Sequence, residues 1–209
     1  DLATGDIVVN GTVVHSGYDV SGGIASRSTG GNVYVALNSL QIESGATFTI
    51  TNSAAATARP VIVTVRGDAV VNGTLDVSGL SFGGCGLGHA SNSGFGGGSG
   101  GAFGAASGAG GSGDGQPTGI TAGVNPCGNN VEAGIAIGSI GGGGRLLSGF
   151  GSGGAGGGAV QISAVGTFTQ SGVVVASGRA GTKSAEGGNG GGSGGAILIE
   201  ATNYVGSGT

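Results

Sequence analysis

The chain has 209 residues, of which 56 are glycine and only 8% are charged, and its formal net charge is −4. Six scattered basic residues argue against nucleic-acid binding, and no apolar run is long enough to span a bilayer. The low charge content differs from that of ordinary disordered chains, and a total of three prolines excludes collagen. The length fits a single domain over residues 1–209.

A twenty-residue pattern recurs along the chain, with a small turn pair near the middle of each copy. The first predicted element, residues 5–17, reads GDIVVNGTVVHSG and nearly repeats residues 67–79, GDAVVNGTLDVSG, so it corresponds to the second half of a copy. The last element, residues 196–209, corresponds to the first half. We therefore expect two incomplete repeats, one at each end of the array. The longer copies between them lie at residues 32–51, 60–79 and 159–178.

Apolar residues alternate with other residues over five positions in the first half of each copy, which is typical of a half-buried strand. A second short strand follows the turn and carries Val13, Leu75 and Val174 at one aligned position. Without helical periodicity, the pattern predicts an all-β fold, either a short β-solenoid or a sandwich of stacked strand pairs. The shared offset predicts ladders of Val33, Val61, Val160 and Ile197, of Val35, Val63, Ile162 and Ile199, and of Leu37, Val65, Ala164 and Ala201.

A glycine-rich insert of about residues 80–158 separates two of the copies. Glycine recurs at every third position in three stretches, which suits an extended, polyglycine II-like helix whose bare face packs on a neighbour. Interspersed Phe, Leu and Ile residues favour packed segments over a flexible linker, which is the alternative. The triplets are Gly94, Gly97 and Gly100, Gly151, Gly154 and Gly157, and Gly188, Gly191 and Gly194.

Two cysteines, Cys85 and Cys127, lie in the glycine-rich insert. Their separation does not match a zinc motif, so we expect a disulfide, with free thiols as the alternative. A disulfide predicts an extracellular or cell-surface location. The opening residues, DLATGDIVV without Met, look like those of a processed mature protein.

Glycine runs that lead directly into strands occur at residues 190–200, GGGSGGAILIE, and at residues 153–162, GGAGGGAVQI. In this respect the chain resembles glycine-rich repetitive β-solenoid proteins of bacterial cell surfaces. Its triplet glycine tracts are similar to the polyglycine bundles of phage tail-tip adhesins. The resemblance covers roughly residues 94–200. It implies a secreted structural or adhesive role and transfers no catalytic residues.

Residues with catalytic or metal-binding chemistry are sparse. The ten carboxylates are spread singly, so we expect no metal site, no cofactor and no enzymatic activity. The GGSGG segments at 97–101 and 191–195 match the nucleophile-elbow pattern but lack its strand–turn–helix setting. Asn10 and Asn72 begin Asn-Gly-Thr sequons, for which turn formation is the alternative to glycosylation.

These features predict a structural subunit of a secreted extracellular filament or surface appendage. We expect it to form a homopolymer head to tail, by joining the incomplete repeat of one copy to that of the next. Two alternatives remain: an adhesin or receptor-binding tip that contacts cell-surface or extracellular-matrix glycans, and an ice-binding protein. We expect the subunit interface to contain Ile7, Val9, Val13, His15, Ile197, Ile199 and Tyr204.

Overall fold

The computed structural model describes residues 7–9, 12–15, 20–21, 24–29, 32–51, 60–80, 145–146, 149–150, 154–181 and 190–208. Every regular element among them is a β-strand, so the predicted all-β class is confirmed. Contacts divide the chain into two compact units. The strand unit comprises residues 1–77, 159–175 and 197–209, and the glycine unit comprises residues 78–158 and 176–196.

The strands are short except for β13 and β15, and β13 alone spans the positions that form two strands, β8 and β9, in the second copy. The glycine unit holds the antiparallel pair β11 (Arg145–Leu146) and β12 (Gly149–Phe150), together with the first residue of β15. The remaining strands are β1 (Ile7–Val9), β2 (Thr12–His15), β3 (Val20–Ser21), β4 (Ile24–Thr29), β5 (Asn32–Leu37), β6 (Leu40–Ile42), β7 (Thr47–Thr49), β8 (Val61–Val65), β9 (Ala69–Val71), β10 (Thr74–Asp76), β13 (Ala159–Gln170), β14 (Val173–Val175) and β15 (Ala196–Gly206).

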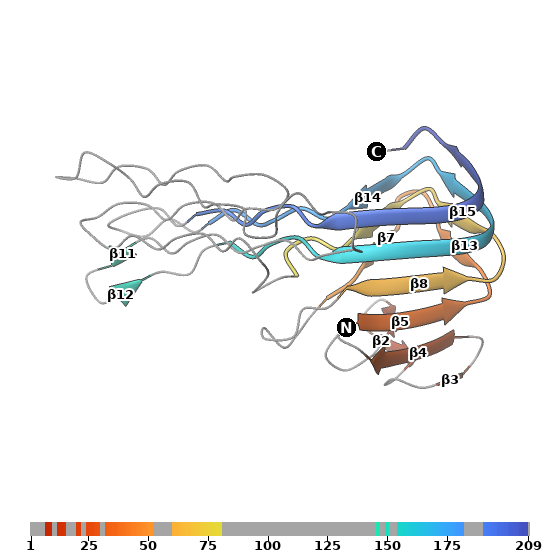
Figure 1. Ribbon diagram of the computed structural model, residues 1–209, viewed down its shortest axis with the longest axis horizontal. Coiled ribbons are helices and arrows are strands. Elements are labelled where there is room, and N and C mark those ends of the chain that lie inside the picture. Colours follow the sequence, from red (N-terminus) through yellow and green to blue (C-terminus); the bar gives the residue numbers. More distant parts are fainter. Residues whose placement is uncertain are drawn as a thin grey trace. The chain divides into compact units, whose positions relative to one another are not determined.

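Parallel pairing joins the strands of the three longer copies to the equivalent strands of the neighbouring copy. β5 pairs with β8 and β8 with the first part of β13, while β6 pairs with β9 and β9 with the last part of β13. β7, β10 and β14 form a separate parallel sheet. Figure 1 shows the larger sheet curling where β13 passes from its pairing with β8 to its pairing with β9. The repeats are therefore held together by backbone bonds between copies.

The observed register confirms the predicted ladders in the three inner strands. Val33, Val61 and Val160 are in register, as are Val35, Val63 and Ile162, and as are Leu37, Val65 and Ala164. The residues of β8 and β13 in these ladders are buried, and Phe168 of β13 is also fully buried. β-branched side chains pack well on a pleated, half-buried surface, which explains why valine and isoleucine dominate the ladders.

The first copy departs from the ungapped alignment on which the repeat was defined. Between the second and third copies, residue partners differ by 99 throughout, from Val61 with Val160 to Thr74 with Val173. Between the first and second copies the difference changes from 28 in β5 to 29 in β6 and 27 in β7. The first copy has four turn residues, 43–46, where the second has Asn72 and Gly73. Gly45 takes a positive φ of 80° in this longer turn.

Three extended segments of the glycine unit, residues 154–158, 176–181 and 190–196, are hydrogen-bonded to one another. Two backbone N–H groups of the first segment, three residues apart, donate to two carbonyl oxygens of the third segment that are also three residues apart. The second segment bonds to both of the others. The backbone bonds are Gly154 N to Gly190 O and Gly157 N to Ser193 O, both 2.8 Å, Arg179 N to Ala155 O and Gly195 N to Ala176 O, both 2.7 Å, and Gly192 N to Arg179 O, 2.9 Å.

Close approach explains why particular positions of these segments are glycine. A Cβ atom at Gly154 or Gly157 would overlap the carbonyl oxygen of a neighbouring segment, as expected for the triplet that contains them. In the third segment the tightly packed positions are Gly192 and Gly195 rather than the expected Gly191 and Gly194. The close approaches in this segment are thus three residues apart, and they are offset by one residue from the glycines of the expected triplet. The triplet at residues 94–100 lies outside the described residues.

The N-terminal strands are arranged differently from the half-repeat that we expected. β1 and β2 pair with each other in antiparallel fashion, with Val8 opposite Val13. An Asn-Gly pair between two short strands is the strongest local signal for a hairpin, which explains this pairing. In addition, β4 pairs antiparallel with β5 along the edge that an earlier repeat would otherwise occupy. The free edges at this end of the stack are those of β6, of β7 and of residues 26–29 of β4, as far as the described strands show.

Candidate functional site

The edge strand β15 exposes several large apolar side chains. β15 pairs with β13, and no described strand pairs with its other edge. Side-chain contacts place Glu200 beside Ser163 and Thr202 beside Val165, so Ile197 continues the ladder of Val160. Val160 is 0% exposed, whereas Ile197 is 41% exposed, in keeping with the lack of a described strand on this edge. Leu198, Tyr204 and Val205 of the same strand are also exposed.

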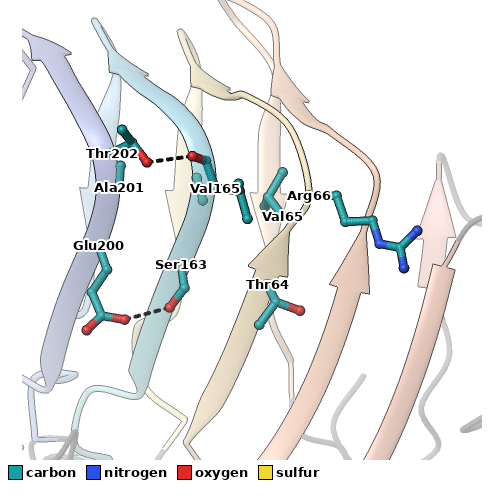
Figure 2. Close-up of a pocket in the computed structure, with 9 residues that line it drawn as sticks. Thr64, Val65, Arg66, Ser163, Val165, Glu200, Ala201 and Thr202 are labelled. Carbon is teal, nitrogen blue, oxygen red and sulfur yellow. Dashed lines mark hydrogen bonds between the residues drawn. The ribbon is translucent and has the colours of Figure 1, made fainter.

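A polar network lies on the outer face of β13 and β15 (Figure 2). The Glu200 carboxylate accepts hydrogen bonds from Ser163 Oγ at 2.7 Å and from Gln161 Nε2 at 2.8 Å. Gln161 Nε2 also lies 3.1 Å from Ser163 Oγ. Both donors are uncharged, so this network orients the carboxylate without cancelling its negative charge. Alternation along the strand puts these side chains on the face opposite the ladders.

The same face carries an open depression of about 450 Å³ across β8, β13 and β15. Its polar lining includes Thr64, Arg66 and Thr202, whose Oγ1 donates to Val165 O at 2.6 Å (Figure 2). Within the described ranges, no group of three His, Cys, Asp or Glu side chains is placed to hold a metal ion. The Ser163–Glu200 pair resembles part of a catalytic triad, but the described lining of the depression includes no histidine to act as a base.

Tyr204 covers the end of the buried core beneath β15. Its ring stacks on that of Phe168, with centroids 5.9 Å apart and planes 7° from parallel. Its hydroxyl donates to Gln170 Oε1 at 3.0 Å, and Gln170 is itself buried. Tyr204 thus supplies apolar cover to Phe168 and a donor to a buried amide, while 56% of its own surface stays exposed.

Two substitutions at Tyr204 separate these contributions. We expect Tyr204→Ala to lower the free energy of unfolding by about 3 kcal/mol, because it uncovers Phe168 and removes a hydrogen bond from a buried amide. Tyr204→Phe keeps the stacking and should cost only about 1 kcal/mol. Urea unfolding followed by circular dichroism measures both values. Equal losses for the two variants would show that ring stacking contributes nothing.

The opposite end of the stack also exposes a ladder residue. Phe48 of β7 is in register with Leu75, and Leu75 is in register with Val174. Leu75 is 2% exposed and Phe48 is 39% exposed. Beside this ladder runs a row of Thr47, Thr74 and Val173, so valine interrupts the threonine row that an ice-binding surface requires. Phe48 was absent from the predicted interface because the ungapped repeat aligned Thr47, and not Phe48, with Leu75 and Val174.

The predicted interface residues lie on two separate sheets. Ile197, Ile199 and Tyr204 are on β15, and the structure places them along the free edge together with Glu200, Leu198 and Val205, which we did not predict. The N-terminal set lies on the β1–β2 hairpin, which pairs with no other described strand. Its contribution to an interface stays a prediction. This set comprises Ile7, Val9, Val13 and His15.

The remaining candidates are either structural or outside the described residues. Asn72 Oδ1 accepts a hydrogen bond from Ser171 Oγ at 2.7 Å, linking the turns of two adjacent repeats. Ser193, in one GGSGG segment, donates to Gly194 O and precedes a strand rather than a helix, so the elbow setting is absent there. Asn10, Cys85, Cys127 and the GGSGG segment at 97–101 lie outside the described residues, so these predictions stay open.

No helix in the described part of the chain combines the length and the apolar character needed to cross a membrane. Comparison with known proteins finds no protein family, no curated protein and no solved structure that matches this chain.

Proposed function

We propose that this protein is a structural subunit of a secreted extracellular filament or surface appendage, and that it assembles head to tail through the two ends of its repeat stack. The observation that carries this proposal is that the exposed fraction of the side chain differs along a single ladder. Ile197 at one end and Phe48 at the other are about half exposed, whereas their ladder neighbours inside the stack, Val160 and Leu75, are buried. Each end thus has an apolar surface that one further layer of strands would bury.

The two ends are different surfaces, and this difference determines the type of assembly. One end is the parallel edge of β15, and the other is formed by β4, β6 and β7. A contact between unlike surfaces is heterologous, and it generates an open filament unless its rotation closes a ring. Unpaired strand edges provide backbone donors and acceptors for such a contact.

The glycine unit fits a load-bearing role in such a filament. We propose that its three bonded segments form a polyglycine II-like bundle, and that the parallel repeats form a short β-solenoid. The three-residue spacing of the bonds between residues 154–157 and 190–193 supports the bundle. The in-register stacking of equivalent strands supports the solenoid. Neither feature needs a cofactor or a catalytic group, and both repeat one structural unit.

A proline on the β15 edge tests the assembly. The Ala196 N–H donates to Gly158 O, and N–H directions alternate along a strand, so the N–H of Ile199 points to the free edge. Ile199→Pro removes that N–H donor. Ile199→Ala shortens the same side chain but keeps the N–H donor. We expect the intact chain and Ile199→Ala to form polymers with rising concentration, and Ile199→Pro to stay monomeric in sedimentation velocity and negative-stain electron microscopy.

Circular dichroism must show that the proline variant keeps the strand content of the intact chain. Polymers of normal length from Ile199→Pro would exclude the β15 edge as an assembly surface. An intact chain that remains monomeric at every concentration would contradict the proposed function itself.

A further inference from the structure

The sheet has a second edge whose charge is opposite to that of β15. At the N-terminal side, β3 pairs only with Ile24 and Ala25 of β4. Residues 26–29 of β4 therefore have β5 on one side and no described strand on the other. Arg27 is the one charged residue of β4, and Glu200 is the one charged residue of β15. Each edge thus carries a single charge, and the two charges have opposite signs.

Register places both charged residues on the same face of the sheet. Arg27 is opposite Tyr34, Tyr34 is in register with Ile62, and Ile62 with Gln161. Residues directly opposite one another on neighbouring strands share a face. Gln161 donates to Glu200, so Glu200 is on this face as well (Figure 2).

Strand direction is compatible with a junction between these edges. β4 runs antiparallel to β5, whereas β5, β8 and β13 run parallel to one another. Figure 1 shows β15 running in the same direction as β13. A β4 strand inserted between β15 of one copy and β5 of the next would therefore be antiparallel to both. All the parallel strands would keep one direction through the junction.

We propose that β15 of one copy pairs in antiparallel fashion with residues 26–29 of β4 in a second copy, and that this pairing brings Glu200 and Arg27 onto one face of the junction. This inference rests on the proposed head-to-tail assembly and names its interface. Opposite charges across neighbouring strands stabilise the pairing, and like charges there destabilise it. Pairing of β15 with β15 of another copy would bring two Glu200 carboxylates into one interface and would stop at a dimer.

A charge exchange tests the junction in the full-length chain. Glu200→Lys and Arg27→Glu each place like charges at the junction, so each should raise the concentration needed for half-maximal assembly about fivefold at low salt. The double variant restores opposite charges and should return to within about twofold of the intact chain. Arg66→Glu is the control for net charge, because Arg66 is exposed between β8 and β9 inside the stack, and it should leave assembly unchanged.

The outcomes separate this interface from the proposed function. Rescue by the double variant, together with weaker single-variant effects at 0.5 M salt, supports the junction. Polymers that assemble normally in both single variants would overturn the junction while leaving head-to-tail assembly intact. A dimer that responds to Glu200→Lys but not to Arg27→Glu would instead identify pairing of β15 with itself. An intact chain that never associates would overturn both proposals.

Discussion

Val63→Asp is expected to destabilise the strand unit by about 3–5 kcal/mol, because it buries a carboxylate without a partner. Val63 lies in β8 between Val35 and Ile162, and these three residues form the middle ladder of the stack. Val63 is buried, and its two ladder neighbours are apolar. A carboxylate at this position therefore has no counter-ion in its ladder. The expected measurement is a large fall in the urea midpoint, with loss of strand signal at room temperature.

The adjacent residue provides a matched control. Thr64 lies on the outer face of the same strand, so Thr64→Asp introduces the same carboxylate into solvent (Figure 2). Its expected cost is within about 1 kcal/mol and reflects the poor strand preference of aspartate. If both variants had the same urea midpoint, the assignment of inner and outer faces in β8 would be contradicted.

Gly195→Ala is also expected to have a large effect, and it acts on the glycine unit. A methyl group at this position would overlap the carbonyl oxygen of Gly158, which accepts the N–H of Ala196. The segments would have to separate, which breaks backbone bonds between them. We expect a loss of about 3 kcal/mol, at the upper end of the cost of overpacking. Faster hydrogen exchange at the Gly154 and Gly157 amides would report the separation.

Gly194→Ala is the control for this substitution. A methyl group there would lie 3.6 Å from its nearest neighbour, Ala176 O, which is an ordinary contact. Removing a glycine from a site that tolerates alanine restricts the unfolded chain, so this variant should be neutral or more stable by about 0.5 kcal/mol. Equal exchange rates in the two variants would show that residues 190–196 do not pack against their neighbours as described.

Much of the strand unit follows from local pattern. The alternation of valine and isoleucine identified the strands, and the common offset identified which residues form ladders, as in Val63 with Ile162. Such a pattern is readable because a strand has a period of two and one of its faces must be buried. The turn lengths were harder to predict. The two extra residues at 43–46 are offset only in part by a connection between β5 and β6 that is one residue shorter, so the register changes from 28 to 29 and then to 27.

Only some residues of the candidate site could be predicted, because the role of the others depends on which strand lies beside them. Ile197, Ile199 and Tyr204 could be selected because they belong to the repeat. Glu200 and Phe48 became relevant only when register placed Glu200 beside Ser163 and Phe48 beside Leu75. A lone carboxylate and a lone aromatic residue carry no periodic signal of their own. Their role depends on which strand, if any, lies next to them.

The sequence by itself determined the all-β class and the inner ladders, because each is a short-range pattern imposed by backbone geometry. Only the tertiary structure decided how the stack ends. The repeat alone allowed residues 5–17 to form half of a further layer, yet β1 and β2 pair with each other and β4 covers β5. The phase of the glycine contacts at Gly192 and Gly195 was decided in the same way. Strand pairing and close backbone contacts join residues that are far apart in the chain. Which of several possible partners a strand takes is therefore decided by packing and not by local preference.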